Sequence, residues 1–253
     1  MPTVNLRSLG YTLATAPSAV STNVAREFVV CNGSNAPGNG GACCLWTVPS
    51  GVYWVTFEMW GGGGGGSGAC CCMGGGGGGS GGYAVKTVCS ATGLAGCQYS
   101  ICASQTSCVT PGAGAKSGYR GCVSYVTGYG LSNFCAEGGS SGDAICFWGF
   151  GCYTCCSMRP CCTTATGGDV CIPGYMGSAQ QSYFCGAYAL AYTPTAAATI
   201  SGPLIGANGC NVWGCGNNLP PVPGMGGWSA TVYGGGCCCG VWGGGGLVAV
   251  KYG

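Results

Sequence analysis

The chain has 253 residues, of which 56 are glycine and 25 are cysteine, and its charged residues amount to 5%. An ordinary domain has about 7% glycine and about 25% charged residues. The seven basic side chains are scattered singly, and histidine is absent. The sequence therefore lacks the basic cluster of a nucleic-acid-binding protein and the commonest general base and metal ligand of enzymes. This composition favours a structural or adhesive protein.

The sequence contains no run of 18 consecutive apolar residues, and we expect no membrane span. Pro2 and Pro17 interrupt the first residues and no continuous apolar run follows Arg7, so we also expect no signal peptide. The cysteines nevertheless indicate disulfides, which persist in oxidising surroundings. A virion component that is made in a cytosol and released by lysis meets both conditions. Because the cysteine count is odd, at least one thiol stays free or bonds another chain.

Residues 1–45 contain three cysteines and an otherwise ordinary mixture of residues. Two interpretations are open. This segment attaches to a partner protein, or its strand-like stretch Arg26–Val30 belongs to the same domain as the remainder. We divide the chain into an N-terminal attachment segment, 1–45, and a glycine- and cysteine-rich β domain, 46–253.

The clearest predicted strand is Val52–Trp60, which is rich in β-branched and aromatic residues and follows a Pro-Ser-Gly turn. Further strands are predicted at Tyr83–Val88, Gln98–Cys102 and Leu247–Tyr252. Residues 112–185 have no long periodic stretch, and we expect long loops held together by disulfides. No segment has the spacing of an amphipathic helix. The predicted fold class is mostly β, a small β-sandwich-like framework with very little helix.

Two pairs of glycine runs each flank a cysteine triplet: Gly61–Gly66 and Gly74–Gly79 around Cys70–Cys72, and Gly234–Gly236 and Gly243–Gly246 around Cys237–Cys239. Glycine offers nothing but backbone for packing. We therefore predict that Gly61–Gly68 and Gly74–Gly79 run as threefold extended helices related to polyproline II, packed against other backbone segments, with the C-terminal glycine runs as candidate neighbours. The sequence lacks the Gly-X-Y period of collagen. We expect most cysteines to form disulfides, because these offset the entropy cost of ordering glycine.

The order of elements across Trp46–Tyr83 resembles the glycine-rich domains of bacteriophage tail fibres and tip adhesins. The shared elements are an aromatic-Thr-Val-Pro-x-Gly turn at 46–51, with Ser50 where the family has alanine, a strand ending in Trp60-Gly61, a polyglycine block, and Gly-Gly-Tyr-Ala before a second strand. The closing glycine runs before a short apolar strand extend the likeness over 46–253. The heavy cysteine content departs from the family pattern.

The resemblance implies a non-enzymatic structural protein on a phage virion surface, which is also found outside the cell after lysis. It implies a tail fibre or tip adhesin involved in host attachment, or a fibre-like capsid decoration. The expected partners are further copies of the chain, with a trimer favoured, other virion proteins bound through residues 1–45, and a host surface receptor. The alternative is an extracellular or cell-surface filament or coat protein stabilised by disulfides.

We expect no catalytic residue, no cofactor and no metal. A zinc site is compatible with the spacing of Cys152, Cys155, Cys161 and Cys162, but crowded cysteines produce such spacings by chance. The candidate receptor-binding residues are aromatic, because tyrosine and tryptophan anchor interfaces. They are Phe147, Trp148, Phe150, Tyr153, Trp213, Trp228 and Trp242. The alternative is that these rings form a local core for the glycine framework.

Overall fold

The structure is a computed structural model that describes residues 26–31, 42–66, 69–70, 78–104, 120–142, 163–174, 224, 237–238 and 243–253. This part of the chain is mostly antiparallel β-strand and contains no helix, which confirms the predicted fold class. The strands form two five-stranded sheets and one short two-stranded ladder.

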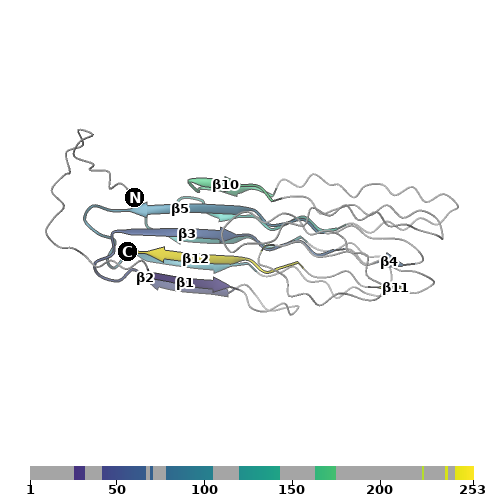
Figure 1. Cartoon of the computed structure of the whole chain (residues 1–253), viewed down its shortest axis with the longest axis horizontal. Helices are drawn as coiled ribbons and strands as arrows, with labels where there is room; N and C mark the ends of the chain where they lie inside the picture. The colour runs from purple at the N-terminus through teal and green to yellow at the C-terminus, as the bar shows by residue number, and fades with distance from the viewer. Residues whose placement is uncertain are drawn as a thin grey trace, which may run out of the picture.

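The first sheet has the strand order β1-β12-β3-β5-β10 (Figure 1). Its strands are β1 at Arg26–Cys31, β12 at Leu247–Tyr252, β3 at Trp54–Trp60, β5 at Tyr83–Cys89 and β10 at Val170–Ile172. The C-terminal strand β12 is inserted between β1 and β3 and pairs with both along its whole length. Strands from both ends of the sequence therefore meet in one sheet.

The second sheet has the order β2-β6-β7-β8-β9. Its strands are β2 at Ala42–Thr47, β6 at Gln98–Ala103, β7 at Ser124–Gly128, β8 at Cys135–Ala136 and β9 at Ala165–Thr166. The two-stranded ladder pairs β4, Ala69–Cys70, with β11, Cys237–Cys238.

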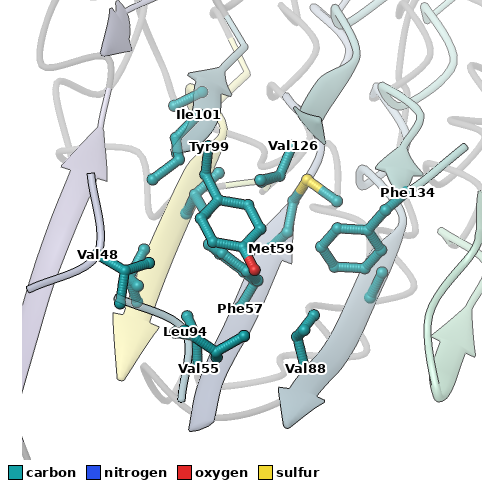
Figure 2. Close-up of a cluster of buried hydrophobic side chains, with 14 of the residues drawn as sticks. Val48, Val55, Phe57, Met59, Val88, Leu94, Tyr99, Ile101, Val126 and Phe134 are labelled. Atoms are coloured by element: carbon teal, nitrogen blue, oxygen red, sulfur yellow. The ribbon is translucent and has the colours of Figure 1, made fainter. Parts of the chain in front are cut away.

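The hydrophobic core lies between the two five-stranded sheets. Side chains alternate between the faces of a strand, and β3 directs Val55, Phe57 and Met59 inward, where all three are fully buried. Figure 2 shows these side chains beside Tyr99 and Phe134, which come from the second sheet and the turn before β8. The rings of Phe57 and Tyr99 have centroids 4.8 Å apart.

The predicted strands at Val52–Trp60, Tyr83–Val88, Gln98–Cys102 and Leu247–Tyr252 are confirmed as β3, β5, β6 and β12. The expectation of loops throughout residues 112–185 is wrong for β7, β8, β9 and β10. These strands have two to five residues each. Such short strands complete too few alternations to leave a periodic pattern, and they form because neighbouring strands offer them backbone partners.

Within the N-terminal segment, Arg26–Cys31 is a strand of the same domain as the remainder, as the second of the two interpretations states. This strand pairs with β12 through all six of its residues. The next strand, β2, spans the division made above between residues 45 and 46, and it pairs with β6 from Ala42↔Ala103 to Thr47↔Gln98. Residues 1–25 and 32–41 lie outside the described part, and attachment through the segment 1–45 stays a prediction.

Candidate functional site

Four glycine-rich segments leave the strands of the sandwich and bond to one another through their backbones. They are 61–66 after β3, 78–82 before β5, 137–142 after β8 and 243–246 before β12. We call these segments the glycine bundle. Every glycine in the bundle is buried, although a run of glycines has no side chain with which to form a core.

The N–H groups of successive glycines in the first segment point to different neighbours. Gly61, Gly62, Gly63 and Gly64 donate to the carbonyl oxygens of Gly82, Cys122, Gly244 and Gly79, at 2.9, 3.1, 2.8 and 2.9 Å. The fourth bond returns to the segment that accepted the first, so the direction repeats after three residues. A β-strand repeats after two residues, and an α-helix bonds within itself. The threefold repeat is that of an extended helix of the polyproline II type, as predicted.

The neighbouring segments repeat in the same way. Gly79 and Gly82 donate to Ser140 and Glu137, while Gly139 and Gly142 donate to Gly62 and Gly65. Each pair of donors and each pair of acceptors is three residues apart. The pairing makes segment 78–82 antiparallel to 61–66, and segment 137–142 parallel to it. The predicted partnership with the C-terminal glycines is also confirmed, because Gly63 donates to Gly244.

Close approach of the backbones explains why these positions are glycine. A β-carbon added at Gly61 would overlap the carbonyl group of Glu137, and one at Gly64 would overlap that of Ser140. Segment 78–82 approaches segment 61–66 equally closely, since a β-carbon at Gly78 would overlap the Gly64 carbonyl. No described glycine of the bundle has a positive φ. Glycine is therefore required here for space and not for a left-handed backbone.

The outer face of the first sheet carries charged and aromatic side chains. Glu58 is 8% exposed and accepts a 2.6 Å hydrogen bond from the Tyr83 hydroxyl. The Nζ atom of Lys251 lies 3.4 Å from the other oxygen of the same carboxylate. Burial, followed by the hydrogen bond to Glu58, raises the pKa of Tyr83 well above its ordinary value. This tyrosine therefore stays a hydrogen-bond donor at every physiological pH.

A second buried tyrosine, Tyr99, differs from Tyr83 in the bonding of its hydroxyl group. Tyr99 is fully buried, and its hydroxyl has no hydrogen-bond partner among the described residues. Burial is the largest cause that raises its pKa to about 12, ahead of the charges of Cys97 and Tyr129. We expect Tyr99→Phe to raise the free energy of unfolding by about 1 kcal/mol, because it removes a desolvated group that forms no bond.

Tyr83→Phe is the matched comparison. We expect it to lower the free energy of unfolding by about 1–3 kcal/mol, because it leaves one oxygen of the buried Glu58 carboxylate without its donor. Urea unfolding curves of both variants and the parent chain measure the two effects. Destabilisation by both substitutions would show that the Tyr99 hydroxyl has a partner in solution.

The outer face of the second sheet is uncharged. The residues that point outward from its strands are Cys43, Leu45, Thr47, Gln98, Ser100, Cys102, Tyr125, Thr127, Cys135 and Thr166. We call this set the neutral face. Leu45 is 69% exposed and Tyr125 is 42% exposed. A sheet face with no ionised group, on which Leu45 and Tyr125 are exposed among uncharged polar residues, suits contact with another protein surface.

The edge of the first sheet is closed by an aspartate. β10 pairs with β5 at three residues, and beyond them Asp169 Oδ2 accepts a 2.8 Å bond from the Thr87 amide. Its other oxygen lies 2.6 Å from Lys86 Nζ. The bond from Lys86, and then that from Thr87, hold the pKa of Asp169 below its ordinary value.

This carboxylate predicts a local pH dependence. A lowered folded pKa contributes stability that is present above the unfolded value, about 3.9, and is lost as the pH falls through the folded pKa. We therefore expect the Thr87 amide to lose protection from hydrogen exchange in acid, as the pH falls through the lowered pKa of folded Asp169. In Asp169→Ala, which removes the acceptor, the protection of this amide should be weak at every pH. Unchanged protection in Asp169→Ala would mean that the carboxylate does not hold the edge.

All seven aromatic residues predicted to bind a receptor lie outside the described residues, so that prediction stays untested. They are Phe147, Trp148, Phe150, Tyr153, Trp213, Trp228 and Trp242. Sequence reasoning missed Leu45 and Tyr125 of the neutral face. For Leu45 the signal was the alternation in Cys43-Cys44-Leu45-Trp46-Thr47, where Trp46 packs against the core and its neighbours point outward.

The described cysteines include one disulfide, Cys43–Cys102, which joins β2 to β6. Six others in the described part are free: Cys44, Cys89, Cys97, Cys122, Cys135 and Cys171. The expectation that most cysteines are paired is therefore not met among these residues. The four cysteines with zinc-like spacing lie outside the described part. In that part we find no cluster of three or more metal-ligating side chains and no helix long and apolar enough to cross a membrane.

Comparison with known proteins adds no family to these observations. No protein-family model and no curated protein sequence matches the chain.

Proposed function

We propose that the chain is a non-enzymatic structural protein of a phage virion surface, either a tail fibre or tip adhesin that takes part in host attachment or a fibre-like capsid decoration. The observation that carries the proposal is the glycine bundle. Its segments extend from strands of the sandwich, and its N–H groups bond to neighbouring segments in three directions. Such a bundle is stiff across its width, and its glycines have no side chains with which to form a reaction site. It suits a rigid element that presents loops or termini at a distance.

The low charge of the chain supports assembly into a larger particle. Charged residues make up 5% of the sequence, and the described ones lie off the neutral face. A monomer would leave this face exposed to water, including its apolar residue Leu45 and its aromatic residue Tyr125. We therefore propose a homo-oligomer, with a trimer favoured, in which the neutral face contacts another copy of the chain.

Electron microscopy with a gold-labelled antibody fragment tests the location. A fragment raised against the purified chain should label particles at the tail or on the capsid. A genome in which the gene lies beside capsid or baseplate genes would agree with this result. Labelling confined to cell walls or extracellular filaments would overturn the proposal and support the disulfide-stabilised coat protein instead.

Light scattering with two matched variants tests the assembly. Leu45→Glu places a charge on the neutral face, whereas Val170→Glu places one at an exposed apolar position of the first sheet, where Val170 is 47% exposed. We expect Leu45→Glu to dissociate the oligomer and Val170→Glu to leave its mass unchanged. A monomeric parent chain would refute self-assembly, and an intact oligomer in Leu45→Glu would refute the role of this face.

A further inference from the structure

The short ladder of β4 and β11 brings a cysteine of the first triplet opposite a cysteine of the last. The register places Cys70 directly opposite Cys237, and Ala69 opposite Cys238. The two cysteines are far apart in the sequence, and each belongs to a triplet flanked by glycine runs. In Figure 1 the labels of β4 and β11 lie away from the five-stranded sheets. We propose that Cys70 and Cys237 form a disulfide that joins the first triplet to the last.

The backbone spacing of the ladder suits this bond. Directly opposed residues of antiparallel strands have α-carbons about 4.5–5.5 Å apart. The range for disulfides is about 4.4–6.8 Å, so no backbone movement is needed. The second sheet provides a precedent in the same molecule. Cys43 and Cys102 are directly opposed on antiparallel strands, and they are bonded.

The position of the ladder gives the bond a structural role. β4 lies three residues after the first glycine run and β11 lies five residues before the last. The same two runs bond to each other through Gly63 and Gly244. A Cys70–Cys237 bond would join these two segments covalently, where glycines offer hydrogen bonds alone. The inference does not depend on where the protein works, since a phage fibre and a coat filament would both gain a crosslinked bundle.

The bond requires an oxidant, which we take to be a low-molecular-weight disulfide such as oxidised glutathione. The thiolate of one cysteine attacks the small disulfide, which forms a mixed disulfide and releases one glutathione thiolate. The second cysteine, after loss of its proton, attacks the protein sulfur of the mixed disulfide and releases the second glutathione. Two protein thiols are oxidised, and one small disulfide is reduced to two thiols.

Peptide mapping of the full chain tests the proposal. Free thiols are blocked with N-ethylmaleimide, and the denatured chain is then cut with chymotrypsin without reduction. Cleavage after Trp60, Tyr83, Tyr233 and Trp242 isolates each triplet, because fragment 61–83 contains Cys70–Cys72 and fragment 234–242 contains Cys237–Cys239. We expect the two fragments to be joined in chain treated with oxidised glutathione and separate after dithiothreitol. Separate, fully blocked fragments in the oxidised chain would overturn the proposal.

Two variants test the register. The first carries Cys71→Ser, Cys72→Ser, Cys238→Ser and Cys239→Ser, and keeps Cys70 and Cys237. The second carries Cys71→Ser, Cys72→Ser, Cys237→Ser and Cys238→Ser, and keeps Cys70 and Cys239. We expect linked fragments in the first variant and their loss in the second.

The Cys43–Cys102 bond serves as the folding control in both variants, since it requires the second sheet to form. Equal linkage in both variants would show that crowding and not the register selects the partner. No linkage in the first variant, with Cys43–Cys102 intact, would likewise refute the assignment.

Discussion

Gly64→Ala should lower the free energy of unfolding by about 3 kcal/mol or more, at or above the upper end of the range for overpacked sites. The added methyl group would overlap the carbonyl of Ser140, which is backbone and cannot rotate away as a side chain would. Relief of the overlap would move segment 137–142, and with it the bonds that Gly139 and Gly142 donate to segment 61–66. Alanine also reduces the entropy of the unfolded chain, which favours folding by about 0.4–1 kcal/mol. The overlap outweighs this gain.

Gly96→Ala is the control that separates the cost of a steric overlap from the cost of replacing glycine in a left-handed backbone. Gly96 lies in a turn with a φ of +78°, and a β-carbon there would meet no atom within 4 Å. Its cost should be about 1–2 kcal/mol, the penalty for a left-handed alanine. Urea unfolding of the two variants in parallel measures the difference. If Gly64→Ala proved no more costly than Gly96→Ala, the bundle would be loosely packed in solution, and the rigid element behind the proposed function would be lost.

The long strands and the conformation of the glycine runs could be predicted from the sequence for physical reasons. Val52–Trp60 has enough β-branched and aromatic residues to fill one face of a sheet, and its strand is the one at the centre of the core. A run such as Gly61–Gly66 can be ordered through its backbone alone, which requires close neighbours and favours a threefold helix. In both cases the local composition limits the possible structures to very few.

The pairing of the segments could not be predicted. Nothing in segment 61–66 indicates that its backbone partners lie at 78–82, at Cys122, at 137–142 and at 243–246, because identical glycines provide no register. The short strands β8 and β9 have two residues each, and each depends on a partner already in the sheet, since β8 pairs with β7 and β9 pairs with β8. The neutral face was missed for a related reason. Leu45 and Tyr125 come to lie on the same face only after β6 has paired with both β2 and β7.

The largest expected loss of stability in the sandwich comes from its disulfide. The Cys43–Cys102 bond closes a loop with a sequence separation of 59. In the chain-entropy description, a loop of that size contributes about 4 kcal/mol by restricting the unfolded chain. We therefore expect the double variant Cys43→Ala and Cys102→Ala to unfold at markedly lower urea concentration than the parent chain. Cys122→Ala, which removes an exposed free thiol, should have little effect.

The slope of the unfolding curve shows where the disulfide acts. A crosslink makes the unfolded chain more compact, so its removal should raise the urea dependence of the free energy of unfolding as well as lower the stability. Cys43 and Cys102 point outward from the sheet, and their loss should leave the core between the sheets unchanged. A loss of stability with an unchanged slope would show that the bond acts on the folded sheet. In that case the edge strand β2 would depend on the crosslink for its pairing with β6, and its six paired residues would not hold it there alone.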